Sequence, residues 1–438
     1  MERAKLIVKN FGPLQDIEIE VREMVTFIGA QASGKSTLAK LLSILEDEHF
    51  RKFDNNSFEY ELKKYNIFSY LNNKTHIFYE SFSHKKLPVF NFEHKEEKST
   101  KFSILRKFNL KKTTLHSSDY NENTLIFIDL IKTTINQHKL IKDSSFNKIF
   151  EENKQITEFN KIFKNKANVN NDDIDKILRI LNKDKLIENY NLLFNKIINS
   201  FPNIFQFDSI YIPSERNFLH LIAENTLGLI NNNIQIPKHL LNVGQEYEKA
   251  IHTIKELPLT IIDKNFKYRR EGKTSYIYHN ETEKVDLLES ASGLQSVIPI
   301  LLLVEYSKSL KEKYNFNFVV EEPELNLYPK AQHELIKYLI KNCLFERKNL
   351  ILTTHSPFVL ASINNLLLAF DKGKTKPTEV NKIIKKESWL NPKNFIAYEL
   401  KNGKAKKIMD DKLGQIKENM IDGVSDAFSD EFDKLLDV

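Results

Sequence analysis

The octet GAQASGKS occupies residues 29–36 and fits the pattern G-x-x-x-x-G-K-[ST] at every position. The short apolar stretch Val25–Ile28 precedes it and predicts a buried strand, and Leu38–Leu45 follows it and predicts a helix. A glycine loop between a strand and a helix N-terminus is an anion site, because its N–H groups and the helix dipole converge on phosphate oxygens. The sequence therefore predicts a P-loop that binds a nucleoside triphosphate.

The residues of this loop have separate expected roles. Lys35 would reach the outer phosphates, and the hydroxyl of Ser36 would hold Mg²⁺. ATP and Mg²⁺ are accordingly the expected ligands. The nucleotide-binding residues predicted here are Gly29, Ala32, Ser33, Gly34, Lys35, Ser36 and Thr37.

Length and composition exclude several classes of protein. The chain has 438 residues, 41% of them hydrophobic, with 31 Phe and 16 Tyr, which is ample for a core and excludes global disorder. Apolar runs such as Val297–Val304 are too short to span a bilayer, and the N-terminus has no signal-peptide pattern. Cys343 is the only cysteine, which excludes internal disulfides and a cysteine-built metal site. These features predict a cytoplasmic protein without membrane contact, and the net charge of +6 permits nucleic-acid binding without requiring it.

The pattern of residues along the chain predicts an α/β fold with an insertion. Residues 1–48 and 205–400 carry the strand patterns and the expected nucleotide site. Residues 49–204 are rich in Lys, Asn, Phe and Ile and poor in Gly, with helical spacing at Ile174–Leu181 and Leu192–Ile198. We therefore expect a mostly helical insertion at 49–204 and a helical tail at 401–438.

Two adjacent carboxylates follow a second apolar strand. Phe318–Val320 predicts a buried strand, and Glu321 and Glu322 stand at its C-terminal end. A P-loop site needs one carboxylate to order the Mg²⁺ shell and another group to position the attacking water. Glu321 is the predicted metal-side residue, and Glu322 is the predicted catalytic residue.

A histidine ends the next predicted strand. Asn349–Thr354 is apolar and runs into His355, with one helix expected between this strand and the carboxylate strand, at about 330–342. Such a β-α-β unit has a right-handed crossover and brings both strand ends to the same sheet edge, where ligands bind in open α/β sheets. His355 is therefore expected beside Glu322, where an imidazole could sense the outer phosphate or the attacking water.

A third segment adds small residues at the start of a helix. Ser292 and Gly293 precede the apolar stretch Val297–Ser307, and a helix start of this kind can donate to phosphate. Taken alone the segment predicts only a helix cap, but it stands just before the carboxylate strand.

Together these segments resemble the head of an ABC-type ATPase. Residues 29–36 are similar to its Walker A loop, 318–322 to Walker B with the catalytic glutamate, 292–295 to the signature loop, 325–329 to the D-loop and His355 to the switch histidine. The strings KNFG at 9–12, YIPSER at 211–216, EEPE at 321–324 and THSP at 354–357 further resemble ATPases of the overcoming-lysogenization-defect (OLD) type. Related heads occur in the Septu, PARIS and retron-associated anti-phage systems.

The resemblance implies a partner chain, and this sequence differs from the family pattern at three positions. Heads of this kind dimerise head to tail, so Ser292 and Gly293 would complete the site of the partner chain. Glu321 stands where most such heads have Asp, Tyr328 where the OLD-like group often has His, and Leu294 in place of the second signature Gly. The position of a Q-loop glutamine is not fixed by the pattern, and Gln206 is ambiguous.

OLD nucleases also carry a Toprim domain, which this sequence is expected to lack. Only 83 residues follow His355 (438 − 355), and they contain the acidic pairs Asp410–Asp411 and Asp430–Glu431. These acids are expected to be solvated charges rather than metal ligands.

The leading functional hypothesis is a switch ATPase that forms a homodimer or higher homo-oligomer on ATP. It would control a separate effector protein such as a nuclease, in bacterial anti-phage defence. One alternative is an SMC-like DNA-binding repair ATPase, for which basic stretches such as Arg106–Lys112 and Tyr268–Arg270 could contact phosphates. Another is a nucleotide sensor with little hydrolysis. A transporter subunit is disfavoured by the size of the insertion.

Overall fold

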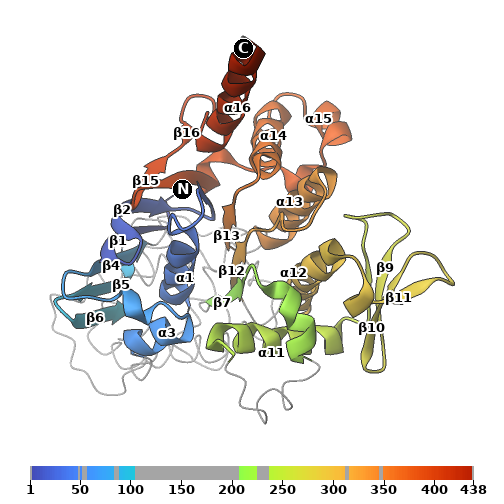
Figure 1. The fold of residues 1–438 in the computed structure, drawn as a ribbon, viewed down its shortest axis with the longest axis horizontal. Helices are drawn as coiled ribbons and strands as arrows, with labels where there is room; N and C mark the ends of the chain where they lie inside the picture. Colours follow the sequence, from blue (N-terminus) through green and yellow to red (C-terminus); the bar gives the residue numbers. More distant parts are fainter. Residues whose placement is uncertain are drawn as a thin grey trace, which may run out of the picture.

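The computed structural model of this chain describes residues 2–47, 50–51, 57–82, 88–103, 207–223, 236–310, 315–344 and 349–436. Within these residues, eleven strands form one sheet in the order β6-β5-β4-β1-β2-β15-β14-β3-β13-β12-β7 (Figure 1). Their bounds are β1 (Ala4–Phe11), β2 (Leu14–Val21), β3 (Met24–Gly29), β4 (His76–Phe82), β5 (Pro88–Lys95), β6 (Lys98–Ser103), β7 (Phe207–Ile212), β12 (Asn315–Glu321), β13 (Asn349–Thr354), β14 (Phe395–Lys401) and β15 (Lys404–Lys407).

The sheet has a parallel half and an antiparallel half. Strands β14, β3, β13, β12 and β7 are all parallel, whereas β6, β5, β4, β1 and β2 pair antiparallel. Every residue of β3 and β13 is buried, as expected for strands covered on both faces. In β1 buried residues alternate over most of the strand with less buried ones, because one face packs on the core and the other does not.

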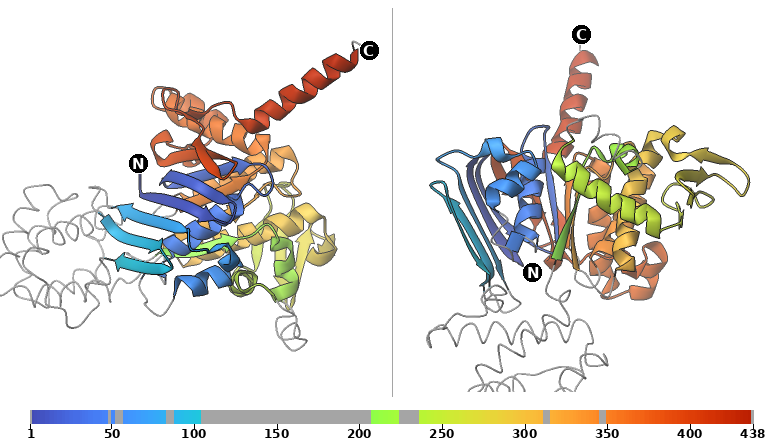
Figure 2. Two further views of the ribbon diagram at one scale, coloured as in Figure 1. Left: turned by 60° about the vertical axis from the view of Figure 1, so that its left-hand side comes forward. Right: turned by 90° about the horizontal axis from the view of Figure 1, so that it is seen from below.

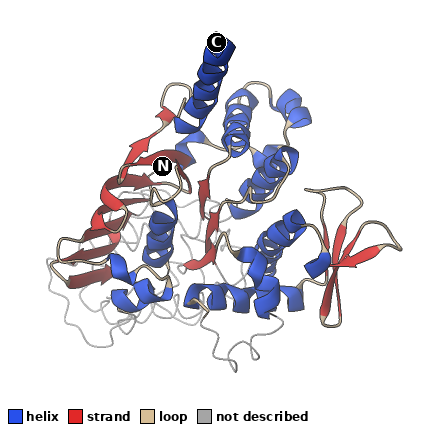
Figure 3. Ribbon diagram, in the orientation of Figure 1, coloured by secondary structure: helices blue, strands red, loops and turns tan. Residues whose placement is uncertain are grey.

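Helices cover both faces of the parallel half. Helix α1 lies between the two halves of the sheet, and α11, α12, α13 and α14 lie on the other side of the parallel strands (Figures 1 and 3). The helices are α1 (Lys35–Glu46), α3 (Phe58–Lys64), α11 (Lys238–Thr253), α12 (Ser292–Ser309), α13 (Pro329–Cys343), α14 (Pro357–Gly373), α15 (Pro377–Ile383) and α16 (Met420–Leu436). Short 3₁₀ turns lie at Phe68–Tyr70, Arg216–Phe218, Leu287–Glu289, Lys386–Ser388 and Pro392–Asn394.

Two smaller sheets accompany the main one. The strands β8 (Glu256–Pro258), β9 (Lys267–Glu271), β10 (Thr274–Tyr278) and β11 (Lys284–Asp286) form an antiparallel sheet beside the start of α12 (Figure 1). The strands β16 (Met409–Asp410) and β17 (Gln415–Ile416) form a short hairpin before α16.

The predicted α/β class is confirmed, and so is the order of elements around the loop at 29–36. β3 enters this loop, α1 leaves it, and α13 connects β12 to the parallel neighbour β13. The carboxyl ends of β3, β12 and β13 therefore meet at one edge of the sheet. The residues predicted for the nucleotide site all come from this edge or from the start of α12.

Two predicted boundaries differ from the structure. Residues 76–82 and 88–103, assigned to a helical insertion, form β4, β5 and β6, and β4 pairs with β1 so that they extend the main sheet. Residues 401–438 are not only a helical tail, because β15 to β17 precede α16 and β15 joins the main sheet. The helices predicted at 174–181 and 192–198, and Gln206, lie outside the described residues.

Candidate functional site

The loop at 29–36 is held in shape by backbone geometry that only glycine accepts. Gly34 lies immediately before α1 with a φ of 98°, a left-handed conformation. A Cβ at this position would lie 2.6 Å from Leu14 Cδ2, which is closer than side-chain carbons approach. The tight packing of the loop against β2 thus requires the second glycine of the octet.

The Lys35 side chain folds back over its own loop. Its Nζ donates hydrogen bonds to the carbonyl oxygens of Gly29 (2.9 Å) and Ala30 (2.8 Å), and the residue is only 5% exposed. Burial lowers the pKa of Lys35, and the nearby carboxylates of Glu322, Glu324 and Glu321 act in the opposite direction. The cation therefore lies in an acidic neighbourhood without a direct ion pair among the described residues, as suits a group that exchanges loop carbonyls for phosphate oxygens.

Glu321 is the buried member of the predicted carboxylate pair. It ends β12 opposite Thr353 of β13, and it is 3% exposed. Burial raises the pKa of its carboxyl group, while the hydroxyls of Ser36 and Tyr211 act to lower it. Among the described residues its Oε1 has no hydrogen-bond partner. A buried acceptor without a partner, facing the Ser36 hydroxyl, fits a site for a divalent cation.

Glu322 and His355 lie together, as the topology predicted. The His355 Nε2 is 3.2 Å from Glu322 Oε1, and their side chains are 34% and 26% exposed, so both can reach solvent. Glu322 has a φ of 42°, a sparsely populated conformation for a residue with a Cβ. Its N–H donates to the carbonyl oxygen of Thr353 (2.9 Å), which fixes this conformation at the strand end.

Glu324 positions His355, a role that sequence reasoning did not assign. Its Oε1 accepts hydrogen bonds from Thr354 Oγ1 (2.8 Å) and from the backbone N–H of His355 (2.7 Å). Burial raises the pKa of Glu324, and these donors act to lower it. The only signal in the sequence was its place in the string EEPE at 321–324.

Arg216 is a second residue without a predicted role, and it is completely buried. Its guanidinium donates to four carbonyl oxygens, of Pro213 (3.2 Å), Ser296 (2.9 Å), Glu321 (2.7 Å) and Glu322 (2.8 Å). Burial lowers its pKa to about 10, so the group stays charged at neutral pH. One side chain thus joins the end of β7, the first turns of α12 and both residues of the carboxylate pair.

His220 lies beneath the same part of α12 in its neutral form. Its Nε2 lies 2.9 Å from the Gln295 carbonyl oxygen, to which it donates, and its Nδ1 accepts from the Tyr247 hydroxyl (2.7 Å). Burial lowers the pKa of His220 to about 4. Its unperturbed pKa is about 6.5, so below that pH the unfolded chain binds a proton that the folded chain does not.

Acid is therefore expected to destabilise the fold through His220. Between pH 7 and pH 5 this residue should cost about 2 kcal/mol of unfolding free energy, because the unfolded state gains the proton first. Urea unfolding of wild type and His220→Gln at both pH values measures it. The variant should lose less stability on acidification than wild type, and an equal loss in both proteins would contradict the assignment.

The predicted signature residues Ser292 and Gly293 form the start of α12. Ser292 is exposed, and a Cβ on Gly293 would lie 2.6 Å from the carbonyl oxygen of Asn326. Gly293 is thus needed for contact with the segment that resembles a D-loop. Among the described residues, neither Ser292 nor Gly293 forms a hydrogen bond with the P-loop of the same chain.

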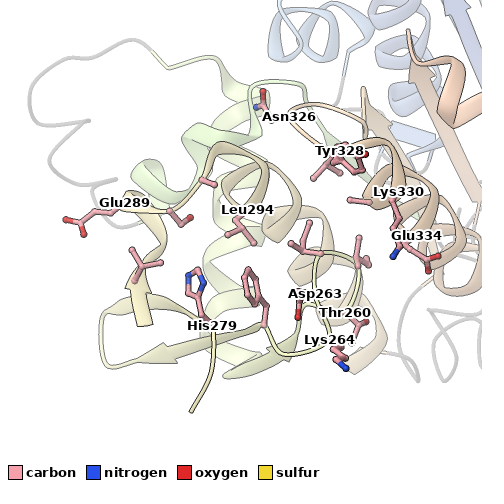
Figure 4. Close-up of a pocket in the computed structure, with 18 residues that line it drawn as sticks. Thr260, Asp263, Lys264, His279, Glu289, Leu294, Asn326, Tyr328, Lys330 and Glu334 are labelled. Carbon is pink, nitrogen blue, oxygen red and sulfur yellow. The ribbon is translucent and has the colours of Figure 1, made fainter. Parts of the chain in front are cut away.

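A cavity of about 890 Å³ adjoins this segment, between α12, the start of α13 and the small sheet (Figure 4). Apolar side chains such as Ile261, Phe266 and Leu294 line it, and Lys264, Lys330 and Glu334 are among its charged residues. The predicted D-loop residues Asn326 and Tyr328 border it, and Tyr328 is 78% exposed. None of the residues that line the cavity belongs to the loop at 29–36.

The basic residues at 268–270, predicted as possible nucleic-acid contacts, are engaged with other residues of the protein. Arg269 forms an ion pair with Glu256 (2.7 Å) within the small sheet, and Arg270 donates to Ser275 Oγ (2.9 Å). Both side chains therefore have protein partners. Arg106–Lys112 lies outside the described residues. None of the described helices is both long and apolar enough to cross a membrane.

Comparison with known proteins identifies one family. Residues 1–360 match the family described as the AAA ATPase domain. No curated protein sequence matches the chain. Similar solved structures include the SMC head domain from Thermotoga maritima, with 11% identity, 93% of this chain and 98% of that chain covered, and a TM-score of 0.37. The Smc head domain with coiled coil and joint from Pyrococcus yayanosii has 8% identity, covers 94% and 98%, and has a TM-score of 0.39.

Proposed function

The chain belongs to the AAA ATPase domain family, and from this membership and the site geometry we propose that it binds and hydrolyses ATP between β3, β12 and β13. The observation that carries the proposal is the contact of Glu322 with His355 at 3.2 Å, at the same sheet edge as Lys35. A carboxylate that is accessible to water and oriented by a histidine is suited to polarise an attacking water.

The residues of the site divide the work of phosphoryl transfer. Lys35 exchanges its two loop carbonyls for phosphate oxygens and stabilises their charge. Glu322 accepts a hydrogen bond from the attacking water and takes up its proton. His355 holds the Glu322 carboxylate and contacts the outer phosphate. Glu324 keeps His355 in place through its backbone N–H.

Ser36 and Glu321 are the residues that would hold Mg²⁺. The fit rests on the buried Glu321 Oε1, which lacks a hydrogen-bond partner among the described residues. When bound, the metal would neutralise charge on the phosphate oxygens. Glutamate in place of aspartate suits contact through water, because Mg²⁺ keeps several waters of its own.

The active form we propose is a head-to-tail homodimer in which each site takes Ser292 and Gly293 from the partner subunit. The exposure of Ser292 at the start of α12 supports this arrangement, since the helix start is available to a second chain. An N-terminal helix end binds phosphate through its free N–H groups and its dipole. In such a dimer both nucleotide sites form when the two subunits associate, and both are lost when the subunits separate.

Mixing two inactive variants tests the shared site. Lys35→Ala lacks the P-loop cation, and Ser292→Glu places a negative charge where the partner's phosphate would bind. Each is expected to lose about 100-fold or more in phosphate release. A one-to-one mixture should recover about a quarter of the wild-type rate, because half of the dimers are mixed and each has one intact site.

The matched control is Ser309→Glu, at the exposed far end of the same helix, which should hydrolyse ATP like wild type. If the mixture stays inactive while Ser309→Glu is active, each chain uses its own Ser292, and if Ser292→Glu alone hydrolyses ATP like wild type, Ser292 is not used at all. In either case the head-to-tail arrangement is wrong.

We also propose that the nucleotide state of this dimer controls a separate effector, such as a nuclease, in defence against phage. The support is the resemblance of the strings at 211–216, 321–324 and 354–357 to OLD-like ATPases. The same two serine variants test the role in cells that carry the native locus. Phage should plate better on cells with Ser292→Glu than on cells with Ser309→Glu, and equal plating would contradict a defence role.

A further inference from the structure

Helix α16 projects from the body of the protein (Figure 2). Contact with the body is confined to its first turn, where the Met420 N–H donates to Glu399 Oε2 (2.8 Å) and Met420 and Ile421 pack at the edge of the core. From residue 422 to residue 436, every described side chain is exposed. The helix therefore presents almost its whole length to a partner.

The two faces of α16 differ in chemistry. At 100° per residue, one face carries large apolar side chains and the opposite face carries acids. The apolar residues, each between 48% and 71% exposed, are Val424, Phe428, Phe432, Leu435 and Leu436. The acids of the opposite face are Asp422, Asp426, Asp430 and Asp433. This pattern is typical of a helix that buries one face in an assembly.

An isolated helix of this length is barely stable in water, because most helical stability in proteins comes from packing of the apolar face. The second half of α16 has no such packing within the described residues. Gly423 lowers its intrinsic helix propensity further, since a helix-interior glycine costs about 1 kcal/mol relative to alanine. A partner that covers the apolar face would supply the missing stability.

The spacing of the apolar face identifies the partner. When two copies of α16 lie antiparallel and centred on residue 430, Phe428 of each lies at the level of Phe432 of the other. In the same register Val424 lies at the level of Leu436. Both acidic faces then point to water, away from the contact. Two-fold self-complementarity of this kind is what an isologous interface between identical chains requires.

We propose that α16 forms an antiparallel pair with α16 of a second copy of this chain. The exposed apolar side chains offer about 500 Å² per copy, so the pair buries about 1,000 Å², near the lower limit for a specific interface. The helices are about 25 Å long, and the pairing places the two bodies at opposite ends. The contact is therefore independent of the nucleotide site, and it does not rest on the proposed ATPase function.

Light scattering without nucleotide and with a chelator tests the pairing. Wild type at about 50 µM should show twice the 51.4 kDa mass of one chain. Phe428→Glu with Phe432→Glu should give monomers, and the control pair Asp426→Gln with Asp430→Gln on the opposite face should stay dimeric. Because these side chains do not contact the body, ATP binding should be unchanged in both variants. Circular dichroism should be unchanged in the dimeric control and should lose at most the helical signal of α16 in the monomeric variant.

A wild-type protein that is monomeric under these conditions would overturn the proposal, and so would a Phe428→Glu/Phe432→Glu protein that remains dimeric. The orientation has its own measurement. Spin labels at Asp422→Cys should lie about 25 Å or more apart in an antiparallel pair, whereas about 10–15 Å would mean that the helices are parallel. Cys343 is buried and does not compete for the label.

Discussion

Glu322→Gln is expected to lower the rate of phosphate release by about 100-fold or more and to leave ATP binding intact. Glutamine has nearly the shape of glutamate, so the N–H···O bond from residue 322 to Thr353 and the left-handed backbone are preserved. Its amide can still contact His355 but cannot accept a proton from water. Binding and turnover should therefore separate in this variant.

Three readouts check this expectation: phosphate release, affinity for fluorescent ATP, and mass in the presence of ATP–Mg²⁺. The variant should bind ATP with wild-type affinity and show a larger mass with ATP–Mg²⁺ than without it, because the step that separates the nucleotide-bound heads is blocked. Glu379→Gln, an exposed residue of α15, is the control and should behave like wild type. If Glu322→Gln hydrolyses at the wild-type rate, Glu322 and His355 are not the catalytic pair.

Arg216→Met is expected to cost about 3–5 kcal/mol of unfolding free energy, the largest stability loss among the substitutions considered. Methionine fills a similar space but donates no hydrogen bond, so the carbonyl oxygens of Pro213, Ser296, Glu321 and Glu322 lose this buried donor. A buried acceptor without a partner costs about 1–3 kcal/mol. Urea unfolding at pH 7 measures the change.

Arg216→Lys tests whether Arg216 positions the Glu321–Glu322 turn or only stabilises the fold. Lysine keeps the charge but cannot reach four acceptors at once, so the Glu321–Glu322 turn would be held less firmly. The value of kcat should fall about tenfold or more while the affinity for ATP stays unchanged, because among the described residues the hydrogen bonds of the Arg216 side chain go to Pro213, Ser296, Glu321 and Glu322 and not to the P-loop. If Arg216 served stability alone, the folded fraction of Arg216→Lys would show wild-type kcat, and that result would refute a positioning role.

The sequence was sufficient for the parts of the site that depend on local pattern. The octet at 29–36 predicted the strand, loop and helix, and parallel topology placed Glu322 beside His355. The strand, loop and helix follow from neighbouring residues, and the position of Glu322 beside His355 follows from the order of the parallel strands. The assigned roles of these residues remain predictions.

Longer-range contacts could not be anticipated in the same way. Arg216 precedes the carbonyls of Glu321 and Glu322 by about a hundred residues, and nothing in a charged side chain indicates that it will be fully buried. The strands β4 to β6 fall in the predicted helical insertion because residues 49–204 are rich in Lys, Asn, Phe and Ile, poor in Gly and helical in spacing further along. These segments form strands because β4 pairs with β1, a long-range contact that their own sequence does not indicate.

Helix α14 connects the candidate nucleotide site to the projecting helix α16. It starts two residues after His355, capped by the Ser356 hydroxyl, and Asn364 within it exchanges two hydrogen bonds with the backbone of Ile416, just before α16. A rod of about 25 Å that tilts by about 10° moves its far end by about 4 Å. Phosphate loss sensed at His355 would thus move the far end of α16 relative to the body. Spin labels at Asp16→Cys in β2 and Asp433→Cys in α16 of one chain measure this movement, and an equal separation with and without ATP would show that α16 is not coupled to the nucleotide site.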